Sequence, residues 1–166
     1  MPEKETTQRA RQDAREGKSP STQAGEFVRE EIHHVREGKH GARSTKQAVA
    51  IGLSKARRAG VKLRPPKKGT TSKKTRLSAE RAYRKGQSGS KRRPSAKRAR
   101  AVKRALKREG RGAASRKALS SQARSAARRR SGASRSAAAK KAARTKGPAG
   151  RSTAAKKAAR TRARRR

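Results

Sequence analysis

The groups in this chain with the clearest chemical potential are the cationic side chains of its last 76 residues. Residues 91–166 hold twenty arginines and ten lysines against a single acid, Glu109, and so contribute most of the formal net charge of +43. Each cation that neutralises a phosphate releases condensed counterions, and arginine also binds phosphate bidentately and can enter a narrow minor groove. We therefore predict that this stretch binds a nucleic acid tightly and that its affinity depends on salt concentration.

We predict that phosphate contacts come from the clusters of neighbouring lysine and arginine residues in this stretch and from a secondary basic patch nearer the N-terminus. The predicted nucleic-acid-binding residues are Lys91, Arg92, Arg93, Lys97, Arg98, Arg128, Arg129, Arg130, Lys140, Lys141, Arg144, Lys156, Lys157, Arg160, Arg164, Arg165 and Arg166, and the secondary patch is Lys46, Lys55, Arg57 and Arg58. Only Phe27 and Tyr83 are aromatic, so the stacking platforms of single-strand binders are missing. We expect little sequence specificity.

Other chemistries have weak support. The chain has no cysteine, no complete set of nucleophile, base and orienting acid, and no phosphate-binding glycine loop, so we predict no catalytic residues, no cofactor and no enzyme activity. Three histidines lie near three glutamates between residues 30 and 40, and Glu30 and His33 have a spacing used in carboxylate-bridged metal sites. One such pair is too little, and we predict no metal site.

The elements that position these side chains begin with an N-terminal segment of different composition. The first 37 residues hold eight of the ten acids and seven bases, whereas the rest of the chain is strongly basic. Apolar residues recur at three- and four-residue intervals over about residues 20–37, after Ser19 and a proline, and this pattern predicts a first helix. A second helix is expected over about 45–59, where Ser44 and Gln47 form a capping box. Two such helices joined by a short turn predict a helical hairpin over residues 19–64. A hairpin this small is expected either to dimerise or to be marginally stable alone.

The remaining segments offer little to bury. Only fifteen residues are large and apolar, and nine of them lie in residues 27–63. We therefore expect a polar arm at residues 1–18 that is either a frayed helix or disordered, and a basic linker at 65–90 in which only residues 78–85 could form a brief helix. The tail at 91–166 is expected to be largely disordered when free and to become helical when a polyanion neutralises it. The predicted fold class is mostly α with extensive disorder.

The tail contains a duplication. Residues 135–145 recur at 151–161 with one difference, Ala137 against Thr153, and residues 147–148, Gly-Pro, separate the copies. Alanine, lysine and arginine favour helix, while like charges four residues apart oppose it by a few tenths of a kcal/mol per pair.

These duplicated Ala/Lys/Arg segments resemble the tails of linker histones and of bacterial histone-H1-like proteins. Residues 19–69, and in particular the stretches beginning at Glu26 and Ser44, look like a block found in small basic bacterial proteins of uncharacterised function. Together the resemblances imply a bacterial nucleoid-associated protein in the cytoplasm.

The function expected from charge and resemblance is non-enzymatic, largely sequence-independent binding and compaction of DNA. The alternative is an RNA-binding or ribosome-associated assembly protein. A membrane-active cationic peptide is disfavoured, because the longest apolar run has six residues and the first residues contain several acids. No membrane partner is expected, whereas the hairpin could mediate a homodimer.

Overall fold

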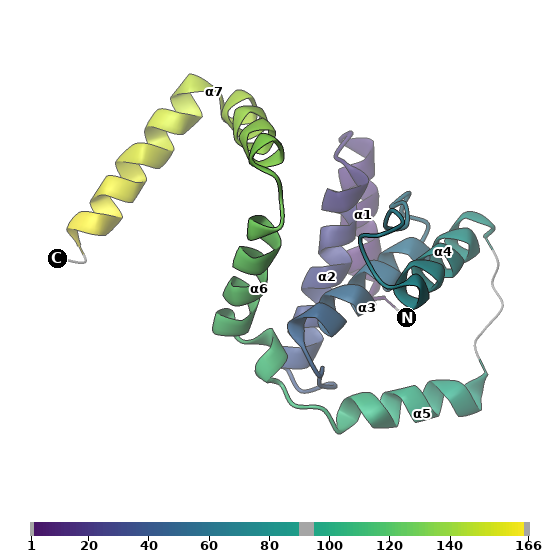
Figure 1. Cartoon of the computed structure of the whole chain (residues 1–166). Coiled ribbons are helices and arrows are strands. Elements are labelled where there is room, and N and C mark those ends of the chain that lie inside the picture. The colour runs from purple at the N-terminus through teal and green to yellow at the C-terminus, as the bar shows by residue number, and fades with distance from the viewer. Residues whose placement is uncertain (1, 90–94, 165–166) are drawn as a thin grey trace. The chain divides into compact units, whose positions relative to one another are not determined.

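The computed structural model describes residues 2–89 and 95–164, and this part of the chain is all α. The helices in chain order are α1 (Lys4–Arg15), α2 (Pro20–Arg36), α3 (Thr45–Arg58), α4 (Lys73–Gln87), α5 (Ala96–Lys107), the 3-10 turn η1 (Gly112–Ala114), α6 (Arg116–Arg128) and α7 (Gly132–Ala163) (Figure 1). The chain divides into two compact units, residues 1–122 and 123–166. No helix of the described ranges is long and apolar enough to cross a membrane.

The two helices of the expected hairpin are present, and each ends one residue earlier than expected. Ser19 caps α2 by accepting a hydrogen bond from the Thr22 N–H at 3.4 Å, and Ser44 caps α3 by accepting from the Gln47 N–H at 3.2 Å. Gly38 ends the α2 segment with a φ of 76°, a left-handed conformation that favours glycine.

The helices α2 and α3 cross closely because a glycine lies at the contact. A Cβ on Gly52 of α3 would stand 2.6 Å from the Cα of Val28 and 3.0 Å from the carbonyl oxygen of Phe27. A side chain at position 52 would therefore force the two helices apart.

The hairpin is covered by segments that the sequence placed outside it. Helix α1 packs on α2, α4 packs on α3, and η1 contacts both hairpin helices (Figure 1). One core cluster joins Ala10 of α1 to Phe27, which is fully buried, and a second joins Val35 to Ala114 of η1. These contacts bury the apolar stripe of the hairpin within one chain, whereas the prediction of a dimer rested on two short helices burying little by themselves.

The expectation of extensive disorder is wrong, because the segments predicted to be an arm, a linker and a conditionally helical tail contain α1 and α4 to α7. Two physical effects explain the difference. Many of the buried residues are small, such as Ala79 and Ala82 on α4, and a count of large apolar side chains does not include them. In the tail, the helix propensity of alanine, arginine and lysine outweighs repulsion between like charges, and a serine cap adds to it where Ser131 accepts from the Ser134 N–H at 3.2 Å.

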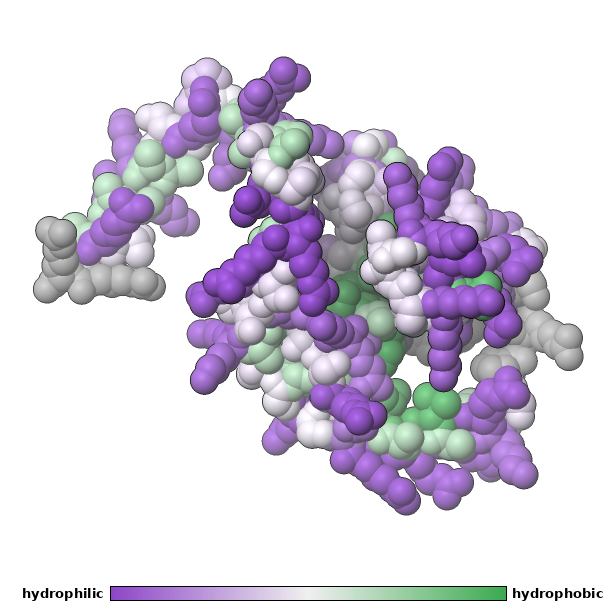
Figure 2. All heavy atoms as spheres, viewed as in Figure 1, coloured by the Kyte–Doolittle hydropathy of each residue, from purple (hydrophilic) through white to green (hydrophobic). Residues whose placement is uncertain are grey.

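The second unit consists of the end of α6 and of α7, described here by itself. Helix α7 has no buried residue, and its backbone leaves the helical conformation at Gly147, with φ 64° and ψ 177°, just before Pro148. The duplicated segments 135–145 and 151–161 thus lie in two helical stretches on either side of a kink. Along α7, Figure 2 shows long hydrophilic side chains separated by the paler green of alanine.

Candidate nucleic-acid interface

The predicted phosphate-binding residues that the structure describes are exposed and lie on or beside helices α5 to α7. Lys97 and Arg98 are on α5, Arg128 ends α6, Arg129 and Arg130 precede α7, Lys140, Lys141, Arg144, Lys156, Lys157 and Arg160 are on α7, and Arg164 follows it. Lys91, Arg92, Arg93, Arg165 and Arg166 lie outside the described residues.

Helix α7 is the most uniform cationic surface among these elements. Its 32 residues include ten bases and no acid. Lys140 and Arg144 are four residues apart and so share a helix face, and Lys156 and Arg160 repeat this arrangement beyond the kink. No acid follows Glu109 in the sequence, so none of these cations has an intramolecular carboxylate nearby in the chain.

The first unit adds an arginine cluster that the sequence analysis missed. Arg36 from α2, Arg111, and Arg116 at the start of α6 line a shallow depression together with Ala114 and Ser115. The Arg36 Nε–H donates a hydrogen bond of 3.0 Å to the Ala114 carbonyl oxygen, which ties the end of α2 to η1. Arg36 and Ala114 are 78 residues apart, and no local sequence pattern signals that contact.

The secondary basic patch on and near α3 is divided by the fold. Lys46 and Arg58 are exposed. Lys55 lies between two buried carboxylates, with its Nζ 2.7 Å from Glu31 Oε2 and 3.1 Å from Glu30 Oε1. Burial disfavours the charged form of Lys55 and is the largest effect, but the two ion pairs outweigh it and raise the pKa of Lys55.

Arg57 is also engaged inside the first unit. Its Nε–H donates to the Leu63 carbonyl oxygen at 3.2 Å, its Nη2 donates to the Arg64 carbonyl oxygen at 3.5 Å, and burial lowers the pKa of Arg57. Two of the four patch residues thus hold the hairpin and the segment after it together. This arrangement does not suit a DNA-recognition helix, which would present all its basic side chains to the major groove.

A second cluster gathers carboxylates and histidines at the C-terminal half of α2. The Glu30 carboxylate accepts the Glu3 N–H at 3.1 Å, which satisfies a free N–H where α1 begins. Burial opposes the ionisation of Glu30, yet the pKa of Glu30 is lowered, because this hydrogen bond and the Lys55 ion pair outweigh burial.

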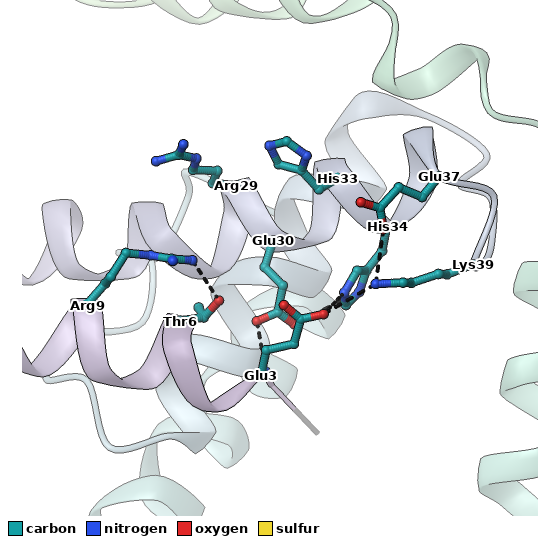
Figure 3. Close-up of a pocket in the computed structure, with 9 residues that line it drawn as sticks. All are labelled: Glu3, Thr6, Arg9, Arg29, Glu30, His33, His34, Glu37 and Lys39. Atoms are coloured by element: carbon teal, nitrogen blue, oxygen red, sulfur yellow. Dashed lines mark hydrogen bonds and ion pairs between the residues drawn. The ribbon is translucent and has the colours of Figure 1, made fainter.

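The Glu3 side chain reaches the same cluster from the start of α1. Its Oε1 lies 2.9 Å from His34 Nε2 and 3.3 Å from Lys39 Nζ, and these two contacts lower the pKa of Glu3 (Figure 3). His33 points away from this carboxylate in the same view.

The side chains that lie close together are Glu31, His34 and His40. They differ from Glu30 and His33, whose spacing in the sequence suggested a possible metal-binding pair. Counted from the buried Phe27, Glu31 and His34 fall at i+4 and i+7, on the buried face of α2, and His33 falls on the exposed one. This register was available in the sequence as a signal that could have found the pair. His40, which joins them from the turn after α2, carries no such signal.

The fold and its charge distribution define a small helical protein with strongly cationic C-terminal helices. Residues 15–68, which include α2 and α3, match the model of a family of unknown function (DUF6496). No curated protein and no solved structure matches the chain. The family match agrees with the expected resemblance of residues 19–69 to an uncharacterised family, whereas the resemblance of the tail to histone-H1-like proteins received no support.

Proposed function

We propose that this protein binds the phosphate backbone of duplex DNA with little sequence preference and compacts DNA by neutralising and bridging it, without enzyme activity. The observation that carries the proposal is α7, in which ten bases, no acid and no buried residue occur over 32 residues. Lys97 and Arg98 on α5 and the depression lined by Arg36, Arg111 and Arg116 supply further cations.

The helical state of the tail favours tight binding. Ordering a backbone residue costs about 1–2 kcal/mol, and a helix formed before binding avoids that cost when it meets the polyanion. Like charges such as Lys140 and Arg144 repel each other by a few tenths of a kcal/mol in the free helix. Phosphates relieve that repulsion, so binding and helix stability reinforce each other.

The test compares a variant of α7 with a variant of equal net charge. Lys140→Gln, Lys141→Gln and Arg144→Gln remove three exposed cations of α7, whereas the control Arg9→Gln, Lys18→Gln and Lys39→Gln removes three cations that are paired with acids in the first unit. Fluorescence anisotropy measures affinity for a labelled DNA duplex and for a structured RNA of equal length over a salt series.

We expect the log-log salt slope for DNA to fall by about 2.7 in magnitude for the α7 variant, and affinity at 0.15 M salt to fall on the order of 100-fold, since each phosphate contact contributes about 0.9 to the slope. The control variant should change much less. Equal effects of the two variants would show that net charge alone governs binding. RNA binding tighter than DNA binding by orders of magnitude would replace this proposal with an RNA-binding one.

The proposal also predicts where the protein lies in the cell. A fluorescent fusion should coincide with the bacterial nucleoid, and its overproduction should make the nucleoid more compact. A fusion that follows ribosomes instead would contradict DNA as the partner.

A further inference from the structure

Three potential metal-binding side chains converge beside α2, at a place with no part in the proposed DNA interface. Glu31 and His34 come from α2 and His40 from the turn after it, and one donor atom from each lies within 4.8 Å of the other two. The Glu31 Oε1 and the His40 Nε2 are 3.4 Å apart. All three belong to the first unit.

The histidines are oriented as metal ligands usually are. His40 Nδ1 lies 3.1 Å from the Gly41 carbonyl oxygen, which can accept its proton and so leave the Nε2 lone pair facing Glu31. His34 Nε2 is 2.9 Å from Glu3 Oε1, an acceptor for its proton, and its Nδ1 lies 4.0 Å from Glu30 Oε1. A ligating histidine commonly donates its other N–H to a carboxylate or a backbone carbonyl, and this contact fixes its tautomer and ring orientation.

The third donor, Glu31, is a buried group with unused bonding capacity. Its side chain is 0% exposed, and its Oε1 accepts no hydrogen bond within the described residues. The Oε2 atom is balanced by the Lys55 ammonium at 2.7 Å, whereas the neighbour of Oε1 is the His40 imidazole at 3.4 Å. The His40 tautomer that donates from Nδ1 would bring its Nε2 electron pair against this buried carboxylate oxygen, and a cation between the two atoms would satisfy both.

We propose that Glu31, His34 and His40 bind a Zn²⁺ ion. Two imidazole nitrogens and one carboxylate oxygen form a donor set that Zn²⁺ uses with a fourth ligand such as water. Ligands at about 2.0–2.1 Å in a tetrahedron are about 3.3–3.5 Å from one another. The Glu31 to His40 separation of 3.4 Å already has this value, and a donor atom of His34 lies within 4.8 Å of both.

Lys55 does not compete for the same oxygen. Its Nζ pairs with Glu31 Oε2 and with Glu30, so a metal on Glu31 Oε1 would leave both ion pairs in place. Ion pairs here join Glu3, Glu30, Glu31 and Glu37 with Lys39 and Lys55, and the guanidinium groups of Arg9 and Arg29 line the pocket beside them.

Zinc would fix the turn after α2 to α2 itself and, through Glu3, to the start of α1. The site is therefore assigned a structural role in the first unit. It neither rests on DNA binding nor supplies it.

The test uses the full chain without a histidine tag, freed of metal with a chelator. Isothermal titration with ZnCl₂, and competition with a chromophoric chelator, should give one site per chain, and the thermal midpoint should rise with Zn²⁺ but not with an equal concentration of Mg²⁺. His40→Ala should weaken Zn²⁺ binding by more than about 100-fold, and Glu3→Gln by about 10–100-fold, because outer-shell partners typically contribute that much. His33→Ala, an exposed histidine on the same helix, is the matched control and should bind Zn²⁺ as the parent does.

Native mass spectrometry and the visible spectrum of the Co²⁺ form keep the proposal falsifiable if a variant folds poorly. One Zn²⁺ per chain and a tetrahedral Co²⁺ spectrum support the site. No bound Zn²⁺ at a threefold excess, equal stabilisation by Mg²⁺, or equal losses for His33→Ala and His40→Ala would overturn it.

Discussion

Replacement of Gly52 by alanine tests whether the close α2 and α3 crossing holds the first unit together. The added methyl group would lie 2.6 Å from the Val28 Cα, against an ordinary carbon to carbon contact of about 3.5–4.0 Å, so the helices would have to separate by about 1 Å. That shift would loosen the contacts of the fully buried Phe27 and of the alanines that pack beside it.

The expected change in the free energy of unfolding is the difference between two effects. Alanine gains about 1 kcal/mol over glycine in a helix interior, while overpacking typically costs about 1–3 kcal/mol and occasionally more. Because the overlap is with backbone rather than with the end of a flexible side chain, we place the cost at the upper end. Gly52→Ala should therefore lower the free energy of unfolding by about 2 kcal/mol.

Gly25→Ala on α2 is the matched control. A Cβ at Gly25 meets no atom within 4 Å, so the same substitution should stabilise the protein by about 0.5–1 kcal/mol. Urea denaturation of both variants, followed by circular dichroism, measures the two changes. If Gly52→Ala is as stable as Gly25→Ala, the close crossing is not present in solution.

Three further outcomes follow from the contacts of the first unit. Removal of residues 129–166 should change its free energy of unfolding in 0.15 M salt by less than about 0.5 kcal/mol, as melting curves would show, because α7 buries none of its residues. Lys55→Met should destabilise it by about 3–5 kcal/mol in urea denaturation at pH 7, because two buried carboxylates lose their cation. The lowered pKa of Glu30 means that its contribution is present above its unfolded-state pKa and is lost as pH falls through its folded-state pKa. A pH series of melts should show a smaller acid-side loss in Glu30→Gln than in the parent.

Local patterns in the sequence predicted the hairpin because its signals are local. The caps at Ser19 and Ser44 act within three residues, and the apolar stripe of α2 repeats within one helix. The cover over the hairpin could not be predicted in the same way. Its burial depends on alanines, such as Ala10 and Ala114, and alanine also favours exposed helices, so it does not by itself mark a core.

The prediction for the tail was wrong for a different reason. Its composition, high charge with few large apolar residues, usually indicates disorder because nothing can be buried to offset chain entropy. Helix α7 indeed buries nothing. Its helix depends on propensity and capping instead, and those terms were identified in the sequence but were given less weight than repulsion between like charges.

The distribution of acids explains why only part of this basic chain is available to a polyanion. Within the first unit, Arg9 pairs with Glu26 at 2.8 Å, Lys18 with Asp13 at 2.8 Å, and Lys55 with two glutamates. These pairs stabilise local contacts, and the first 37 residues, with eight acids and seven basic residues, are close to neutral. Beyond Glu109 there is no acid, so each later cation keeps its full attraction for phosphate. The salt slope of the proposed DNA binding should therefore come mainly from residues after 95, while the C-terminal half of α2, where carboxylates and histidines gather, remains free to bind a metal cation.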